Sequence, residues 1–541
     1  MSEAAAAAGW GQDWTPERSA AGDRSPWLII FVISIATFME VLDVSVANVA
    51  LNHIGGSLSA SYDETTWVLT SYLIANAIVI PISGWLADVI GRKRYYMISV
   101  ALFAASSLLC GLAPNLTFLV VARIFQGIGG GGLAPSEQAM MADTFPPQQR
   151  GMAFAAYGIV VIVGPILGPT LGGWITDNAS WHWVFLINVP IGMLSLLLVG
   201  MLVDEPAVLT RERKARIAGG LKVDWVGFLL VAAGLGFLEV TLDRGQRDDW
   251  FSSGGITLSA IASAASLVAL IPWELSREDP VVNLRLLGQR NFSIAFLLLM
   301  VTGVVVFGTT QFIPQLLQQV MGYTATEAGL ALTIGGLATV LVMPVAGFLA
   351  GRADPRLLLG AGLVIQILAI WNMSHLDTDM DFWHASEARL FSAVGLPFMF
   401  VTVSSLAYVG LKPGENNQAS GLMNVARNLG GSMGISLVQT LLAQREQVHQ
   451  SQLAETLNQL NPVYNQSLSH TAHVLQFQGG AAPAAATLEA TGQIYQELQR
   501  QAAMLSFVDA FHALVIVILI LTPTIFLLRG RPAGAPAGPA H

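Results

Sequence analysis

The segment VVARIFQGIGGGGLAP, residues 120–135, places an arginine, Arg123, in an otherwise apolar run. Its glycines Gly127, Gly129 and Gly132 satisfy G-x-G-x-x-G, a pattern typical of loops that hold a dinucleotide pyrophosphate. Such a loop must follow a strand and begin a helix of a βαβ unit. The residues around this segment are instead apolar over the length of a membrane helix. We therefore interpret the glycines as packing residues of a span, which leaves a buried arginine to be explained.

The composition of the whole chain is typical of a membrane protein. Of its 541 residues, 53% are hydrophobic and 11% are charged, whereas soluble domains carry about 25% charged residues. The single cysteine, Cys110, excludes an internal disulfide and a cysteine-based metal site. A net charge of −9 argues against general nucleic-acid binding. The sequence has neither a Walker A motif nor an H-E-x-x-H motif, so an ATP-driven pump is unsupported.

Apolar runs long enough to cross a bilayer recur along the chain. A hydrocarbon core of about 30 Å needs about 20 apolar residues in a helix. The runs of this kind are fourteen in number, at 27–49, 65–87, 95–113, 116–138, 150–174, 184–203, 224–242, 254–273, 292–315, 327–349, 357–374, 388–410, 419–441 and 505–528. With both termini cytoplasmic, nineteen of the 26 Lys and Arg residues fall inside, four outside and three within spans. This bias follows the positive-inside rule and predicts an all-α integral membrane protein with fourteen transmembrane helices.

The spans and the segments between them define the expected domains. In chain order they are a disordered cytoplasmic tail (1–26), an N-terminal six-helix bundle (27–203), a basic cytoplasmic connector (204–223), two inserted helices, spans 7 and 8 (224–273), a C-terminal six-helix bundle (274–528) and a cytoplasmic tail (529–541). Within the second bundle, residues 442–504 form a polar extracytoplasmic loop. Its flanks have helical patterning, so we expect two helices that extend spans 13 and 14 and are joined by a flexible tip.

Related segments indicate an internal repeat. GWLADVIGRKR (84–94) follows span 2 and GFLAGRADPR (347–356) follows span 10, while RIFQG begins at Arg123 and RLFSA begins at Arg389. The order is the same and the spacing is nearly the same. We therefore expect spans 1–6 and 9–14 to form two pseudo-two-fold-related halves, with spans 7 and 8 inserted between them. Two such bundles around a central cavity are the usual architecture of secondary transporters.

Five motifs carry a resemblance to a known family. They are LDVSVANVAL (42–51), GWLADVIGRKR (84–94), RIFQGIGGG (123–131), GIVVIVGPILGPTLGG (158–173) and WHWVFLINVPIG (181–192). Together they resemble the major facilitator superfamily and its fourteen-span drug:proton antiporter branch. Outside these motifs, LDRGQRDDWFSS (242–253), RNFSIAF (290–296) and PQLLQQVMGYTATEAGLA (314–331) are similar to EmrB-type multidrug efflux transporters.

Charged residues within the spans are candidates for proton coupling. Glu40 and Asp43 lie three residues apart on one face of span 1, and Arg123 lies about 12 Å inside the outer end of span 4. Ionisable residues at such depth pair with one another or face a cavity. We expect Arg123 to pair with both span-1 acids, and the resemblance implies that protonation loosens this pair. A static buried ion pair is the alternative. Glu239, midway along span 7, either binds a proton or makes a helix-packing hydrogen bond.

Three further groups of residues are candidates for functional roles. The cytoplasmic gate would consist of Gly84, Asp88, Gly91, Arg92 and Arg94. The antiporter-motif helix, span 5, would depend on Gly164, Pro165, Gly168, Gly172 and Gly173. A possible substrate cavity would include Gln126, Asn188, Arg427 and Asn428. The alternatives are that the basic loop only fixes topology and that span 5 is only a bent packing helix.

The resemblance implies a proton-coupled exporter of lipophilic compounds that works by alternating access in a bacterial inner membrane. It implies no enzymatic activity, no metal and no cofactor, with protons as the coupling ion. It further implies a periplasmic adaptor of the EmrA type and an outer-membrane channel of the TolC type, with 442–504 as a candidate adaptor contact. Two alternatives stay open: an exporter of one endogenous metabolite, such as a siderophore or fatty acid, and a transport-inactive membrane sensor or assembly factor.

Overall fold

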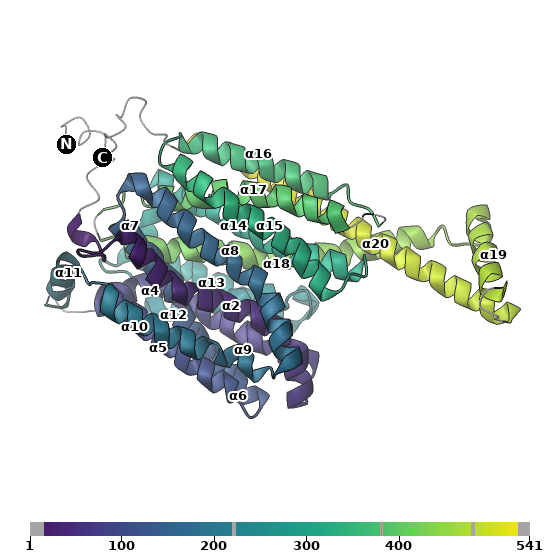
Figure 1. Ribbon diagram of the computed structural model, residues 1–541, viewed down its shortest axis with the longest axis horizontal. Coiled ribbons are helices and arrows are strands. Elements are labelled where there is room, and N and C mark those ends of the chain that lie inside the picture. Colours follow the sequence, from purple (N-terminus) through teal and green to yellow (C-terminus); the bar gives the residue numbers. More distant parts are fainter. Residues whose placement is uncertain are drawn as a thin grey trace.

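The described part of the chain consists of helices and their connections. The computed structural model describes residues 16–218, 223–378, 380, 382–412, 414–477 and 482–528. Four segments named above lie outside these residues: 1–15, part of the connector (219–222), the tip of the extracytoplasmic loop (478–481) and the tail 529–541. Long helices lie side by side in a bundle, and a helical arm projects from one end of it (Figure 1).

The first half of the chain supplies six spans. They are α2 (Pro26–Leu58), α4 (Trp67–Ile90), α5 (Arg92–Gly111), α6 (Leu116–Gly130) continued by α7 (Leu133–Thr144), α8 (Pro147–Asn178), and α9 (His182–Leu186) continued by α10 (Asn188–Leu202). Two short helices, η1 (Pro16–Arg18) and α3 (Tyr62–Thr65), precede α2 and α4.

The glycines of the opening segment lie where span 4 changes from α6 to α7. A Cβ atom at Gly127 would lie 2.5 Å from the backbone oxygen of Tyr72 on α4, and one at Gly129 would lie 2.7 Å from the backbone nitrogen of Phe103 on α5. Real Cβ contacts are not this short, so these positions have no room for a side chain. The interpretation of the glycines as close-packing residues is therefore confirmed.

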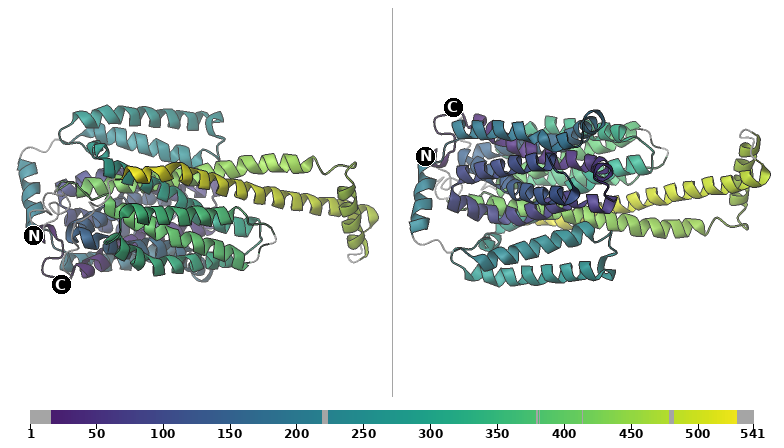
Figure 2. Two further views of the ribbon diagram at one scale, coloured as in Figure 1. Left: turned by 90° about the horizontal axis from the view of Figure 1, so that it is seen from above. Right: turned by 90° about the horizontal axis from the view of Figure 1, so that it is seen from below.

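The second half of the chain supplies the remaining long helices. They are α14 (Arg290–Gln319), α15 (Ala325–Ala350), α16 (Pro355–Met373), α17 (Phe382–Leu406), α18 (Asn416–Ala454) and α20 (Pro483–Leu521), which ends in η4 (Thr522–Leu527). Between the halves come α11 (Ala207–Ala218), α12 (Trp225–Arg244), η2 (Trp250–Ser252), α13 (Gly254–Ser276) and η3 (Leu284–Gly288). Figure 2 shows α12 and α13 as a pair on one flank of the bundle, where α12 contacts α4 and α18.

Thirteen helices of the described residues are long and apolar enough to cross a membrane. The remaining predicted span, 419–441, lies in α18, which is long enough to cross a membrane but not apolar enough to be counted with these helices. The reason is its amide and basic side chains, among them Asn417, Asn424 and Arg427. Since α18 packs against α14, α4 and α20 in the bundle, it can run among the other helices without an apolar surface on all sides (Figure 1).

The segment expected to be extracytoplasmic forms an arm, made by the far ends of α18 and α20, which continue beyond the bundle as neighbouring helices (Figure 2). A helix between them, α19 (Pro462–Phe477), packs against α20 and was not predicted.

The expectation of disorder up to residue 26 is wrong for residues 16–25. Ala20 and Ala21 are buried, the backbone nitrogen of Asp204 donates to the oxygen of Ala20, and Arg18 pairs with Glu212 of α11. This segment lies against the cytoplasmic end of the bundle and is fixed by contacts to residues far away in the chain, which local composition does not reveal.

Candidate functional site

A buried ion pair joins span 1 to span 4. The Nη1 atom of Arg123, on α6, lies 2.5 Å from Oδ2 of Asp43 on α2, and neither side chain is exposed at all. The Nε atom of Arg123 donates to the backbone oxygen of Val68 on α4 at 2.9 Å. A fully buried pair is stable only when its remaining polar atoms are also satisfied. Neighbouring residues do this for Nε and Nη1 of Arg123 and for both oxygens of Asp43, whereas Nη2 of Arg123 is buried without a hydrogen-bond partner among the described residues.

Two amides hold the carboxylate of Asp43. Nδ2 of Asn188 donates to Oδ1 of Asp43 at 2.7 Å, and Nε2 of Gln126 donates to the same oxygen at 2.9 Å. Both amides also lie within 3.1 Å of Oγ of Ser107. Oε1 of Gln126 accepts from Nη1 of Arg123 at 2.8 Å. The carboxylate is thus held by donors from α6 and α10, and Ser107 of α5 accepts from both amides and so helps to orient them.

The prediction that Gln126 and Asn188 line a substrate cavity is corrected by this arrangement. Both side chains are fully buried and are occupied by Asp43 and Ser107. Ser107 was missed, although the adjacent serines of SSLL in an apolar span are a weak signal of a polar contact. The sequence places an amide at the right depth, but only packing determines whether it faces a cavity or a neighbour.

Aromatic rings cover the guanidinium group of Arg123. Its Cζ atom lies 4.4 Å from the ring centroid of Tyr72 and 5.5 Å from that of Phe185. A cation over an aromatic face gains electrostatic stabilisation, more so when it is desolvated. The site therefore stabilises the charged arginine without water.

Glu40 does not join this pair, which corrects the expectation that Arg123 contacts both span-1 acids. Its Oε1 accepts from the hydroxyl of Tyr72 at 3.2 Å and from Nδ2 of Asn76 at 3.1 Å. Because Glu40 precedes Asp43 by three positions on the helix, its side chain points in a somewhat different direction, towards α4. Glu40 is partly exposed, and its charge interacts with that of Arg427 on α18, so it belongs to the region between the halves.

Glu239 lies at a separate contact between α12 and α18. Its Oε1 accepts from Oγ of Ser432 at 2.9 Å, and it lines a small cavity together with Asn428. The neighbouring Arg427 has a buried Nη1 atom without a hydrogen-bond partner among the described residues. The structure thus does not bring Glu239 to Asp43.

The residues expected at the cytoplasmic gate join α18 to the first half. Nδ2 of Asn417 donates to Oδ1 of Asp88 at 2.5 Å, and Nδ2 of Asn416 donates to Oδ1 of Asp143 at 2.5 Å. Asp143 also pairs with Arg92 at 2.5 Å. These contacts, here called the cytoplasmic clasp, hold the two halves together at this end.

Other gate residues have different roles in the clasp. Asp88 pairs with Arg216 of α11 at 3.3 Å, and a Cβ atom at Gly84 would lie 2.7 Å from the backbone oxygen of Asn417. Gly91 has φ +101°, a conformation that favours glycine, between α4 and α5. Arg94 is exposed and contributes no contact to the clasp, which corrects its assignment. The asparagines, Asp143 and Arg216 were missed because nothing local marks them as partners.

The antiporter-motif helix, α8, lies between the halves. Cβ atoms at Gly164 and Gly172 would approach side chains of Val41 and Val46 on α2 to 2.8 and 3.0 Å. A Cβ atom at Gly168 would lie closer still, 2.1 Å from Oγ of Ser45. The backbone oxygen of Pro165 accepts from Oγ of Ser45 at 3.4 Å. Gly173 has no neighbour within 4 Å, so it does not belong to this contact.

Another part of α8 faces the second half. A Cβ atom at Gly151 would lie 2.8 Å from atoms of Gly347 and Ala350 on α15, and one at Gly158 would lie 2.7 Å from Met343. Because α8 touches both α2 and α15, a rearrangement around Asp43 has a direct mechanical connection to the other half.

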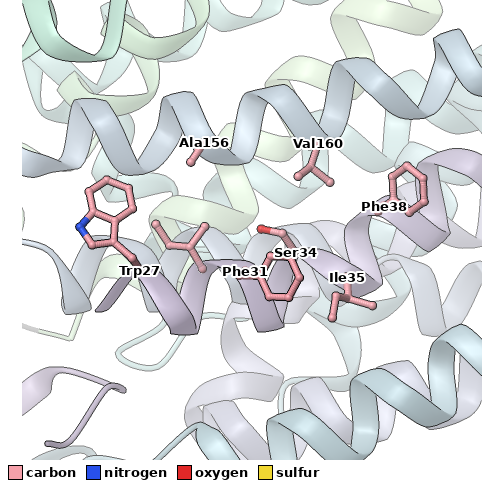
Figure 3. A pocket seen from close by; sticks show the side chains of 8 residues that line it. Trp27, Phe31, Ser34, Ile35, Phe38, Ala156 and Val160 are labelled. Atoms are coloured by element: carbon pink, nitrogen blue, oxygen red, sulfur yellow. The ribbon is translucent and has the colours of Figure 1, made fainter. Parts of the chain in front are cut away.

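An apolar cavity of about 340 Å³ lies away from the ion pair, between α2 and α8 (Figure 3). Side chains that line it include Trp27, Phe31, Phe38 and Val160, with Ser34 as the polar member. Its apolar lining fits lipophilic molecules rather than ions.

Comparisons with known proteins place the chain in a family. Residues 33–435 match the model of the Major Facilitator Superfamily. The multidrug export protein EmrB of Haemophilus influenzae is 38% identical over 444 residues, which cover 82% of this chain and 85% of that protein. The fatty acid resistance protein FarB of Neisseria gonorrhoeae is 34% identical over 517 residues, 96% of this chain and 98% of that protein.

A solved structure of another transporter has a similar fold. The structure of the proton:xylose symporter XylE superposes with a TM-score of 0.57 at 14% sequence identity, covering 92% of this chain and 96% of that one. At that identity the likeness concerns the fold alone. The chain is a multi-pass membrane transporter, not an enzyme, and belongs to the major facilitator superfamily as an export transporter of the EmrB family.

Proposed function

We propose that this transporter exports lipophilic compounds in exchange for protons, by alternating access, from a bacterial inner membrane. The observation that supports this best is the fully buried pair of Asp43 and Arg123. Protonation of Asp43 removes the anion that balances Arg123 in a fully buried site. The pair is then no longer stable in this arrangement, and α2 and α6 rearrange around it.

The rearrangement reaches the second half through α8. Glycines of α8 pack closely on α2 at Val41 and Val46 and on α15 at Gly347. A proton changes the conformational equilibrium only by its different affinity for the two states. Here the difference arises because one state keeps Asp43 as a paired carboxylate and the other allows it to be neutral.

Dye efflux from everted membrane vesicles tests the coupling. Ethidium transport by the wild type is expected to stop when the pH gradient is collapsed, and Asp43→Asn should abolish it. Asp177→Asn, an exposed carboxylate at the end of α8, is the matched control and should transport normally. Transport by the wild type that is unaffected by collapse of the gradient would contradict antiport.

The breadth of substrates is part of the proposal. EmrB of Haemophilus influenzae carries the name multidrug export protein, whereas FarB is named for fatty acid resistance. Several unrelated lipophilic compounds should therefore compete with ethidium. Transport of a single fatty acid or siderophore, with no competition from cationic dyes, would favour the alternative of an exporter for one endogenous metabolite.

A transport-inactive membrane sensor or assembly factor is the candidate from a different class. The close packing around Asp43 and Arg123 would then serve only stability. Purified protein in proteoliposomes separates the two: a sensor moves no ethidium at any pH gradient, while the exporter accumulates it with a gradient of the correct sign.

The arm supports an assembly with a periplasmic adaptor of the EmrA type and an outer-membrane channel of the TolC type. It projects from the end of the bundle opposite to the cytoplasmic clasp (Figure 2). Exposed apolar side chains on it include Val448, Leu488 and Tyr495, which are suited to a protein contact. Replacing α19 by a short linker should reduce co-purification of the adaptor while leaving vesicle efflux intact; unchanged association removes the arm from the interface.

A further inference from the structure

A second buried carboxyl lies on α7, away from the pair of Asp43 and Arg123. Glu137 is fully buried, and no salt bridge to it occurs among the described residues. Its Oε2 lies 2.6 Å from Oγ1 of Thr37 on α2, and its Oε1 lies 3.0 Å from the hydroxyl of Tyr96 on α5. A carboxylate buried in this way without a salt bridge is very costly, because its charge is removed from solvent and has no counter-ion.

The hydrogen bonds around Glu137 require a proton on its carboxyl. The hydroxyl of Tyr96 also lies 2.6 Å from the backbone oxygen of Ile33, which can only accept. A phenol has one proton, so Tyr96 donates it to Ile33. The contact between Tyr96 and Glu137 is then a hydrogen bond only if Glu137 donates. Thr37 supplies the remaining proton to Oε2, and every polar atom of the group is satisfied.

The position of Glu137 connects it with the other acids of the first half. Thr37, Glu40 and Asp43 follow one another at three-residue intervals on α2, about 4.5 Å apart along the axis. Asp43 binds Arg123, Glu40 faces the region between the halves, and Thr37 binds Glu137. The three carboxyls therefore lie at successive depths, with Glu137 nearest to the cytoplasmic end.

The groups that face Glu137 come from every neighbouring helix. Besides the hydroxyl of Tyr96, they are the carboxyl of Glu40 on α2, the phenol of Tyr157 on α8 and, through Glu40, the hydroxyl of Tyr72 on α4. The positive charge of Arg427 on α18 acts on Glu40 and Tyr157. The cation thus acts on Glu40, whereas no salt bridge to Glu137 occurs among the described residues.

We propose that Glu137 is a second proton-binding site of this protein, protonated in the present conformation, which exchanges its proton with Glu40 during transport. One carboxyl gains the proton as the other loses it, so charge is conserved within the pair. The proton is released towards the cytoplasm when α2, α5 and α7 separate and admit water. Its use in transport rests on the proposed antiport, whereas its presence on Glu137 does not.

Infrared spectroscopy tests the protonation directly. Purified wild-type protein in lipid at neutral pH should show the carbonyl absorption of a protonated carboxyl that is lost in Glu137→Gln. Glutamine offers an N–H to Tyr96 and a C=O to Thr37, so the fold should be retained. Glu455→Gln, an exposed position on the arm, is the control and should keep the absorption. A spectrum of Glu137→Gln identical to that of the wild type would overturn the proposal.

Proton release tests the exchange. Ethidium added to wild-type protein in weakly buffered detergent should release protons, and Glu137→Gln should release fewer, whereas Glu455→Gln should behave as the wild type. Equal release from Glu137→Gln and the wild type means that the proton on Glu137 is static, which overturns the exchange. Absence of ethidium binding or transport by the wild type instead contradicts the proposed function, and the infrared measurement still determines whether Glu137 carries a proton.

Discussion

Asn417, in the first turn of α18, donates a hydrogen bond of 2.5 Å to Asp88 at the cytoplasmic end of α4. This contact crosses from one half of the transporter to the other, and Asn416 makes the equivalent contact to Asp143. Asn417→Ala should therefore favour opening of the cytoplasmic side. Hydrogen bonds to charged groups contribute about 1.5–3 kcal/mol, so the closed-to-open ratio should fall by about tenfold or more.

Distances between spin labels at Lys93 and Lys412 measure this opening. The only cysteine, Cys110, is buried, so introduced cysteines can be labelled selectively. Asn465→Ala, an exposed asparagine on the arm, serves as the control. An unchanged distance distribution in Asn417→Ala means that the asparagine is not a determinant of closure.

Arg123→Lys should reduce proton-driven ethidium efflux by at least about tenfold, since it removes hydrogen bonds that each contribute about 1.5–3 kcal/mol. Lysine keeps the positive charge but cannot reach Asp43, Gln126 and the backbone of Val68 with the planar fork of a guanidinium. The assay is efflux from everted vesicles at equal protein levels. Arg94→Lys, at an exposed position, should transport as the wild type; full activity of Arg123→Lys would show that charge alone suffices.

Asn188→Leu should lower the thermal stability of the purified protein. The substitution removes a donor from the buried carboxylate of Asp43 and from Oγ of Ser107, at a cost of about 1–3 kcal/mol. A drop of a few degrees in Tm is expected for a protein of this size. Asn465→Leu on the arm is the matched change without a buried partner. Equal Tm values of the two variants would contradict the role of Asn188 in holding Asp43.

Two neighbouring glycines of α8 provide a matched pair of substitutions. Gly168→Val forces a side chain into Ser45 of α2, and overpacking of this kind costs about 1–3 kcal/mol. Gly173→Val points to open space, with no atom within 4 Å. We expect a lower folded yield and less efflux from the first variant and near wild-type behaviour from the second, measured by fluorescence-detected size-exclusion chromatography and vesicle efflux.

The sequence predicted the helical fold and the partnership of Arg123 with Asp43. Both follow from how far each residue lies within an apolar span, which can be counted along the sequence. An ionisable residue within a span has few stable environments, and two opposite charges at one depth have a strong reason to meet. The rotation of each helix about its own axis, unlike the depth of a residue, cannot be counted along the sequence. It directs Glu40 towards Tyr72 and Asn76 instead of Arg123, and it depends on packing that no local pattern records.

Contacts between distant segments were the least predictable part of the site. Asn416 and Asn417 lie more than 270 residues from their carboxylate partners, and nothing in the local sequence identifies those partners. Glu137 was missed because it is near the expected end of span 4, where a carboxylate facing water would be ordinary. Its fully buried position results from α7 packing against α2 and α5.

In the cytoplasmic clasp, the residues that neutralise the carboxylates differ from the residues that join the two halves. Asp143 has Arg92 as its counter-ion and Asp88 has Arg216, and all four residues precede α12 in the chain. The groups that α18 contributes to these carboxylates are the neutral amides of Asn416 and Asn417. When the halves part, water can replace an amide donor, and no ion loses its partner. Opening this end of the transporter therefore leaves these two ion pairs intact, whereas separating α2 from α6 at Asp43 and Arg123 breaks an ion pair unless the charge on Asp43 changes.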